Sequence, residues 1–394
     1  MHGVLHSSPK MAYASVDKLQ KVLEKNVFHY TKDSKKAAGR ALGILVEIIT
    51  FYMLKSWGFE HSIAIERPLA EYGNPDITHN VEYSLHPILR QQRLIFRHRL
   101  PINATRIMEN IDKKKFSLLG FKKSDKALLT SREILRNSCV IANSKSSHLV
   151  ATLGSIKDDK AKMEIVEQYC RPYAIFECKR VGIEEGMKKG PQTIEKAKQG
   201  AYVAKSLSSM HKLRTASGEL RGLIFRANHK VYSKPYARLL AEIIVSNDRE
   251  LLRDFILTVG VVSNHGNWFT SKNHNKELKV LAQSYDWLLF LTDAGLSKFI
   301  TELLLKPARL LKPARAAFHA SYSMKKTRKK AKNQFTKTQI AYEADLVLQK
   351  YFKDNAKRIS KWFNVIGPRK GTIRRLKIDL SRLREKNWST VHSL

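Results

Sequence analysis

Cysteine is scarce in this sequence. There are three, Cys139, Cys170 and Cys178, and none of them belongs to a CxxC pair. This set supports neither a disulfide framework nor a zinc site built from paired cysteines. The unpaired thiols are typical of a reducing compartment, and the expected location is the cytoplasm.

Long apolar runs are missing as well. The most apolar stretch covers residues 41–54 and is interrupted by Glu47, whereas a membrane-spanning helix needs about 20 apolar residues. The first residues also lack the apolar core of a secretion signal. We therefore predict that residues 35–57 form a buried helix, in which the Glu47 carboxylate needs a partner or a metal.

Acidic residues are few: 35 Asp and Glu stand against 72 Lys and Arg, which gives a formal charge of +37. Such an excess favours a polyanionic partner, because each neutralised phosphate releases counterions. A soluble or ribosome-associated protein that is merely rich in lysine is the alternative. The sequence contains no GxxxxGK[ST] phosphate loop and no methyltransferase glycine motif, which argues against a fused translocase or modification enzyme.

The pattern of apolar residues predicts an α/β core with a central mixed β-sheet flanked by helices. Residues 1–34 form an N-terminal leader and helix, residues 35–305 the core, and residues 306–394 a basic, mainly helical C-terminal region. The core itself contains an inserted, basic and mainly helical region at about residues 85–165.

Within the core, short apolar runs bounded by turn residues predict the strands, and one amphipathic stretch predicts a helix over residues 191–210. A C-terminal helix is expected over residues 340–363. The expected strands cover residues 62–66, 173–179 and 222–228, with 255–262 and 287–291 extending or supporting the sheet.

The stretch PYAIFECKRVG, residues 173–183, ends an apolar strand with an acid and a base. Because side chains alternate across a strand, Glu177 and Lys179 share one face and Phe176 and Cys178 the other. Asp76 follows the turn NP and begins another extended segment. Two carboxylates from adjacent strands could hold a hard divalent cation, and the ammonium could support an attacking water.

The segments NPDI, residues 74–77, and FECK, residues 176–179, resemble the PD…(D/E)xK signature of the restriction-endonuclease-like nuclease superfamily. The resemblance implies that Asp76 and Glu177 bind Mg²⁺ and that Lys179 orients or activates the water. Glu47 matches the acid that many members carry on an upstream helix, as a further ligand. Glu82, on the same extended stretch as Asp76, is the alternative to Asp76.

Among members of this superfamily the sequence looks most like a type II restriction endonuclease, which implies sequence-specific hydrolysis of double-stranded DNA in a bacterial cytoplasm. The resemblance also implies a homodimer and a cognate DNA methyltransferase encoded separately. Two other functions remain open, a non-catalytic basic nucleic-acid-binding protein and a DNA repair or structure-specific nuclease. Glu177 and Lys179 could also be no more than an ion pair at a solvated strand end.

Overall fold

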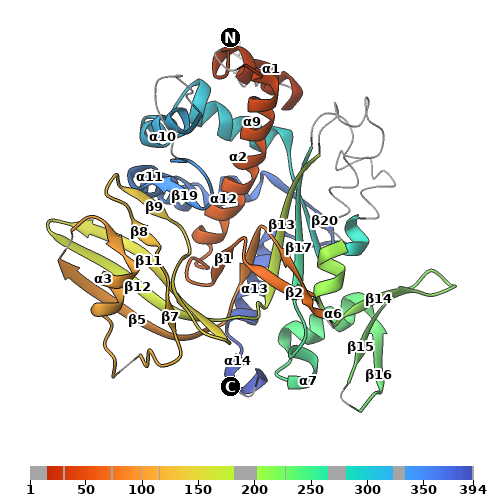
Figure 1. Cartoon of the computed structure of the whole chain (residues 1–394). Helices are drawn as coiled ribbons and strands as arrows, with labels where there is room; N and C mark the ends of the chain where they lie inside the picture. Colours follow the sequence, from red (N-terminus) through yellow and green to blue (C-terminus); the bar gives the residue numbers. More distant parts are fainter. Residues whose placement is uncertain are drawn as a thin grey trace, which may run out of the picture.

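A six-stranded mixed sheet forms the centre of the computed structural model (Figure 1). Its order is β1 (Ile63–Ile65), β4 (Tyr83–Leu85), β13 (Ala174–Val181), β17 (Leu257–Asn264), β18 (Trp287–Leu291) and β20 (Phe363–Gly367). The strands β13, β17 and β18 run parallel, while β1, β4 and β20 are antiparallel to their neighbours. The structure describes residues 16–29, 32–71, 74–97, 99–114, 116–181, 202–226, 228–264, 281–322 and 333–392.

The parallel strands lie in the interior of the protein. Every residue of β18 is buried, and in β17 the described side chains from Leu257 to Ser263 are buried too. Parallel strands covered on both faces read as continuous apolar runs, which is why the sequence located both of them. The predicted strands at residues 62–66 and 173–179 are confirmed as β1 and β13.

Helix α2 (Ser34–Ser56) packs against β13 and carries Glu47. Its N-cap is Asp33, whose carboxylate accepts a hydrogen bond from the Lys36 N–H at 2.9 Å, which satisfies one of the free donors of the first turn. On length and composition α2 could cross a membrane, but 67% of its most apolar window is buried inside the protein. It is the predicted core helix, and α1 (Val16–Asn26) packs beside it.

The expectation of a mainly helical insertion at residues 85–165 is wrong. This region is a five-stranded antiparallel sheet in the order β5 (Ile88–Arg97), β12 (Lys160–Tyr169), β11 (Ser147–Lys157), β10 (Cys139–Asn143) and β7 (Lys122–Lys123). Helix α3 (Ala104–Glu109) is the one helix among its described residues. In β12, Ala161, Met163 and Ile165 are buried while Lys160 and Lys162 are exposed, an alternation that belongs to a half-buried strand.

The predicted strand at residues 222–228 exists as β15 (Leu220–Phe225), but it lies outside the central sheet. It pairs with β14 (His211–Arg214) and β16 (Val231–Pro235) in a three-stranded sheet that projects from the body (Figure 1). Of the helix expected over residues 191–210, residues 191–201 lie outside the described residues, and residues 202–207 are helical.

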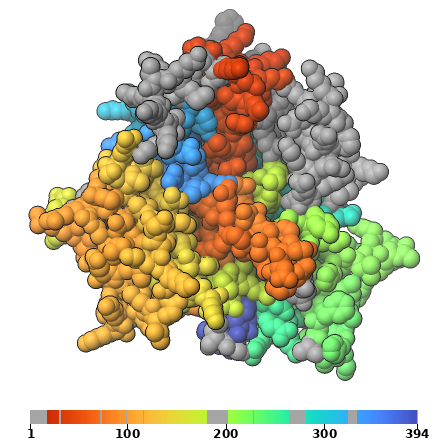
Figure 2. Space-filling model, viewed as in Figure 1, coloured from red at the N-terminus to blue at the C-terminus, as the bar shows by residue number. Residues whose placement is uncertain are grey.

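The C-terminal region is mainly helical, as expected, but it does not form a separate unit. Its strand β20 completes the central sheet, and β19 (Gln339–Ala341) pairs with β9 (Ile134–Arg136) of the inserted region. The expected helix over residues 340–363 is divided into α11 (Tyr342–Asp354) and α12 (Ala356–Ser360). In Figure 2 part of the C-terminal region, drawn in blue, reaches the surface between the red α2 region and the yellow inserted strands. The other C-terminal helices are α10 (Lys312–Tyr322), α13 (Ile373–Arg384) and α14 (Trp388–His392).

Candidate functional site

Glu177 and Lys179 lie on one face of β13, as their spacing predicts. Glu177 Oε1 is 2.6 Å from Lys179 Nζ, and the side chains are 8% and 34% exposed. Phe176 and Cys178 point into the core on the other face, with exposures of 0% and 6%. A central strand therefore presents a nearly buried carboxylate and a partly accessible ammonium side by side.

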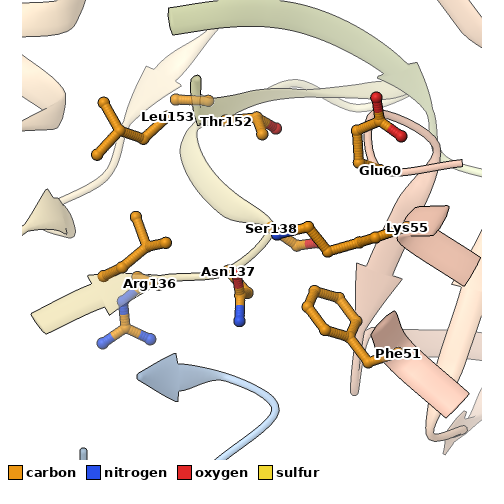
Figure 3. Close-up of a pocket in the computed structure, with 10 residues that line it drawn as sticks. Phe51, Lys55, Glu60, Arg136, Asn137, Ser138, Thr152 and Leu153 are labelled. Atoms are coloured by element: carbon orange, nitrogen blue, oxygen red, sulfur yellow. The ribbon is translucent and has the colours of Figure 1, made fainter. Parts of the chain in front are cut away.

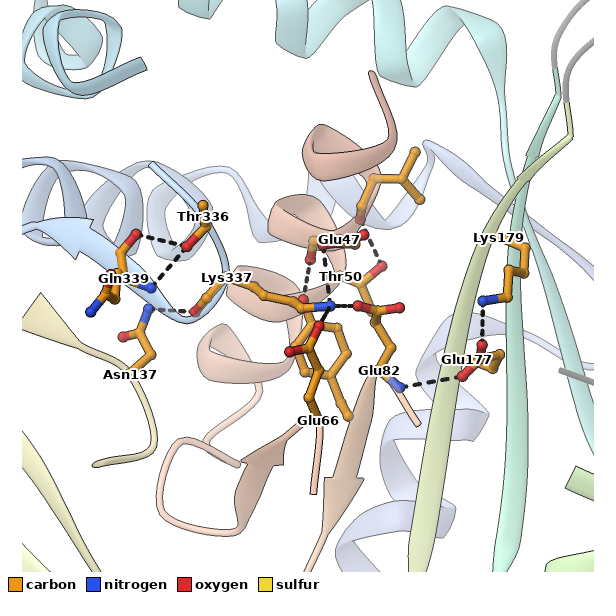
Figure 4. A network of polar contacts seen from close by, with 12 residues as sticks. Glu47, Thr50, Glu66, Glu82, Asn137, Glu177, Lys179, Thr336, Lys337 and Gln339 are labelled. Carbon is orange, nitrogen blue, oxygen red and sulfur yellow. Dashed lines mark hydrogen bonds and ion pairs between the residues drawn. The ribbon is translucent and has the colours of Figure 1, made fainter. Parts of the chain in front are cut away.

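Glu82 joins this pair from the neighbouring strand. It directly precedes β4, and its backbone N–H donates to Glu177 Oε2 at 3.2 Å (Figure 4). Strand β4 pairs with β13 so that Tyr83 lies opposite Phe176, which fixes Glu82 beside Glu177. The Tyr83 hydroxyl donates to the Glu47 carbonyl at 2.8 Å, so the same strand also holds α2 in place.

A second cluster lies on the other side of Glu82 and surrounds the ammonium of Lys337 (Figure 4). Lys337 Nζ is 2.7 Å from Glu66 Oε1 and 3.3 Å from Glu47 Oε2, and it also contacts Glu82 Oε1. The lysine side chain is only 8% exposed. Three carboxylates from α2, from the end of β1 and from the start of β4 thus converge on one cation.

Glu66 reaches this cluster through an unusual backbone. Its φ is 48°, in the left-handed region that residues other than glycine seldom adopt. Its N–H donates to the Glu82 carbonyl at 3.3 Å, which continues the pairing of β1 with β4. The turn keeps Glu66 beside Glu82, although its side chain is 56% exposed.

Asp76 lies apart from these contacts. It is exposed on β3 (Asn74–Asn80), which pairs with β2 (Pro68–Glu71) in a hairpin separate from the central sheet. Among the described residues, its carboxylate makes no hydrogen bond or ion pair with Glu47, Glu177 or Lys179. The chain re-enters the central sheet only at β4, so Glu82, the alternative to Asp76, is the residue whose backbone lies against Glu177, while its carboxylate contacts Lys337.

Burial changes the proton affinity of Glu177 and Glu47. Desolvation raises the pKa of Glu177, and the adjacent Lys179 ammonium opposes this shift only in part. Burial also raises the pKa of Glu47, against the opposing effect of Lys337. Both groups hold a proton more tightly than a solvated glutamate, and a cation placed among them would favour their ionised forms.

The donor set suits a hard divalent cation. Glu47, Glu82 and Glu177 offer carboxylate oxygens, the ligands that Mg²⁺ prefers. As the side chains stand, no group of three or more His, Cys, Asp or Glu in the described part of the chain is arranged to hold a metal ion. A cation nevertheless already lies among Glu47, Glu66 and Glu82, namely the Lys337 ammonium, so the residues fit a positively charged occupant.

An open hollow of about 440 Å³ adjoins the cluster and is lined by residues that include Glu47, Glu66, Arg136 and Lys337. A separate small pocket of about 20 Å³ is lined by Asn137 and lies between α2 and the inserted strands (Figure 3). That volume is about enough for one water molecule. The larger hollow is therefore the one through which a substrate could approach the carboxylates.

Sequence reasoning missed Glu66 and Lys337. Lys337 is far from the other residues along the chain, and in the sequence it is the last residue of a basic run over residues 325–337. The contact between the C-terminal region and the core depends on tertiary packing, for which the sequence carries no periodic signal. Glu66 is the last residue of a predicted strand, which is the one cue to its position.

No family model, curated protein or solved structure matches this chain.

Proposed function

We propose that this protein is a divalent-metal-dependent nuclease that hydrolyses phosphodiester bonds in double-stranded DNA. The observation that carries the proposal is the Glu177–Lys179 pair on a central strand, with Glu82 bound to Glu177 from the adjacent strand. An acid and a base in contact, with further carboxylates nearby, are the parts that metal-assisted phosphodiester hydrolysis needs. The open hollow is lined by Glu47 and Glu66, at the other end of this group of carboxylates.

The order of the elements around the pair supports a restriction-endonuclease-like core. Helix α2 is followed by the antiparallel strands β1, β4 and β13, and β17 then pairs in parallel with β13. Glu177 and Lys179 lie on the third of these strands, β13. The resemblance in the sequence requires an acidic residue at the start of the preceding strand, and Glu82 occupies that position instead of Asp76.

The proposed roles follow from the positions of the side chains. Glu82 and Glu177 would hold Mg²⁺, with Glu47 as the further acidic ligand from α2. When bound, the metal polarises the phosphoryl oxygen and lowers the pKa of a water molecule. Lys179 is 34% exposed, so its ammonium can reach a substrate, orient the attacking water and offset negative charge that develops on the phosphate.

The formal charge of +37 supports a nucleic acid as the substrate. Within this class we favour a type II restriction endonuclease that acts as a homodimer in a bacterial cytoplasm, beside a separately encoded methyltransferase. These narrower assignments rest on the resemblance alone.

The test is cleavage of supercoiled and linear duplex DNA by the purified protein with Mg²⁺, with Ca²⁺ and with EDTA. We expect cutting with Mg²⁺, none with EDTA, and binding without cutting with Ca²⁺, which accepts looser oxygen coordination. Discrete bands would support a restriction enzyme, and cutting without fixed bands a repair nuclease. DNA binding with no cleavage under any of these conditions would mean that the protein is a non-catalytic nucleic-acid-binding protein. Strong cleavage in EDTA would overturn the metal site.

A further inference from the structure

The loop that carries Lys337 is anchored so that its side chain enters the carboxylate cluster. The Asn137 side-chain amide donates to the Lys337 carbonyl at 2.9 Å, and the Asn137 N–H donates to the Thr338 carbonyl at 2.9 Å. Within the loop, the Thr336 N–H donates to the Gln339 carbonyl at 2.8 Å. Asn137 is itself 7% exposed, so the anchor is part of the packed interior.

The contacts of Lys337 match what a buried ammonium requires. A lysine that is 8% exposed needs partners for its charge and its three N–H donors, and Glu47, Glu66 and Glu82 supply one oxygen each. The ammonium in turn neutralises part of a cluster of carboxylates that would otherwise repel one another. In the absence of a metal, Lys337 is thus the counter-ion of the cluster.

Lys337 and a divalent metal would share two carboxylates, since the lysine takes one oxygen of Glu47 and one of Glu82. Glu47 and Glu82 are ligands in the proposed metal site, and both contact the lysine. An ammonium and a divalent cation held by shared carboxylates would lie a few ångströms apart and repel each other strongly in a partly buried site. Lys179 contacts one proposed ligand, Glu177, and is 34% exposed, whereas Lys337 contacts two and is 8% exposed, so the competition falls on Lys337.

We propose that Lys337 is an internal competitor for the metal site: it occupies the Glu47–Glu66–Glu82 cluster in the metal-free protein, and a divalent cation displaces it. This inference rests on the proposed metal-dependent function. Displacement has a route, because the hollow of about 440 Å³ is lined by Lys337, Thr336 and Gln339. Glu66, which is 56% exposed, can keep the ammonium when Glu47 and Glu82 turn to the metal.

Residue-resolved acylation of lysines tests displacement directly in the unmodified protein. The full chain is treated briefly with an acetylating reagent, with and without saturating Ca²⁺, and each lysine is quantified by mass spectrometry. We expect labelling of Lys337 to rise several-fold with Ca²⁺. Lys55, which is 9% exposed and paired with Asp345, is the buried control and should not change, and Lys350, which is 64% exposed, should be labelled in both states.

Calorimetry on the same preparation measures metal binding, and it separates the proposed metal site from the proposed competitor role of Lys337. If Ca²⁺ binds and the labelling of Lys337 stays at its metal-free level, the competitor role is overturned while the metal site stands. If neither Ca²⁺ nor Mn²⁺ binds, the metal site of the proposed function is overturned, and the competitor role falls with it.

Two variants sharpen the test through Mn²⁺ affinity, measured from the signal of free Mn²⁺ in electron paramagnetic resonance. Lys337→Met should tighten binding by on the order of tenfold or more, because the competing charge is gone. Asn137→Ala changes no charge but removes a hydrogen bond that anchors the loop of Lys337. It should tighten Mn²⁺ binding less than Lys337→Met does, because the lysine remains and is only held less firmly in the cluster. Lys55→Met is the matched control and should bind as the wild type does. Unchanged or weaker binding in both Lys337→Met and Asn137→Ala would contradict the proposal.

Discussion

Two pairs of opposite charges with nearly the same geometry lie in different sheets of this protein. In the central sheet Glu177 Oε1 is 2.6 Å from Lys179 Nζ, and in the five-stranded sheet Glu164 Oε1 is 2.7 Å from Arg93 Nε. The pKa shifts of the two carboxyl groups have opposite directions. Burial outweighs Lys179 and raises the pKa of Glu177. For Glu164 burial is also the largest single cause, but the hydrogen bonds from Arg93 and Gln91 and the charge of Arg93 together exceed it, and the pKa is lowered.

The difference lies in what surrounds each carboxylate. Glu164 is 16% exposed and lies across from Arg93 on the paired strand, and that arginine is 73% exposed. Glu177 is 8% exposed on a central strand and has further carboxylates nearby. The length of an ion pair therefore does not distinguish a structural contact from a chemical one, whereas burial and neighbouring groups do.

The largest expected effect is on cleavage. Glu177→Gln should lower the rate of Mg²⁺-dependent DNA cleavage by on the order of 10⁴-fold, the loss typical of an essential catalytic carboxylate, because a metal ligand is removed. Glu164→Gln is the same change in the outer sheet and should cut at the wild-type rate. Both are measured as single-turnover rates on one DNA, with circular dichroism to verify folding. Equal rates for the two variants would place the catalytic site elsewhere.

The next comparison concerns stability. Phe176 is fully buried behind the site, and Phe176→Ala should lower the free energy of unfolding by about 3 to 5 kcal/mol. Ile95 on β5 is 55% exposed, and Ile95→Ala should change it by less than about 0.5 kcal/mol. Urea denaturation monitored by fluorescence measures both. A small loss for Phe176→Ala would mean that this face of β13 is not packed as the structure has it.

The two sheets also differ in how much the sequence predicted. The parallel strands β13, β17 and β18 could be predicted because they are largely apolar, as in β18, where all residues are buried. The antiparallel strands β4 and β20 of the same sheet were not predicted. In the outer sheet, charged residues alternate with apolar ones and the region reads as basic and helical. The register of β12 with β5, in which Glu164 lies opposite Arg93, depends on a partner strand far away in the sequence, so a single segment could not reveal it.

The site shows the same limit. Glu177 and Lys179 could be predicted because strand alternation is a local property, and Glu47 because a carboxylate interrupts an apolar helix. The choice between Asp76 and Glu82 depended on which strand pairs with β13. Asp76 lies on β3, which pairs with β2, whereas Glu82 precedes β4, which pairs with β13. Lys337 enters through a loop anchored by Asn137, a contact that no local pattern encodes.

The opposite pKa shifts predict opposite dependences of stability on pH. The pKa of Glu177 is raised above its ordinary value of 4.5, so the native state binds the proton more tightly, and stability is lost as the pH rises from 4.5 through the folded-state pKa. Glu177→Gln should therefore be as stable as the wild type at pH 4 and more stable than the wild type toward neutral pH. The pKa of Glu164 is lowered, so Glu164→Gln should be less stable than the wild type at neutral pH, a deficit that disappears as the pH falls through the folded-state pKa. Melting curves from pH 8 down to well below pH 4 check both signs. If the stability of the two variants relative to the wild type changed with pH in the same direction, the distinction between the pairs would be removed.

The smallest expected effect is the coupling within the outer pair itself. Arg93 is mostly exposed, so water screens its attraction to Glu164 and holding the long side chain in place costs entropy. A double-mutant cycle with Arg93→Ala and Glu164→Ala should give a coupling of about 0.2 to 1 kcal/mol in the free energy of unfolding. The coupling should shrink further in 1 M salt, where exposed charges are screened over about 3 Å. A coupling above about 2 kcal/mol that salt does not reduce would contradict this, because it would mean that Glu164 is as shielded from solvent as Glu177.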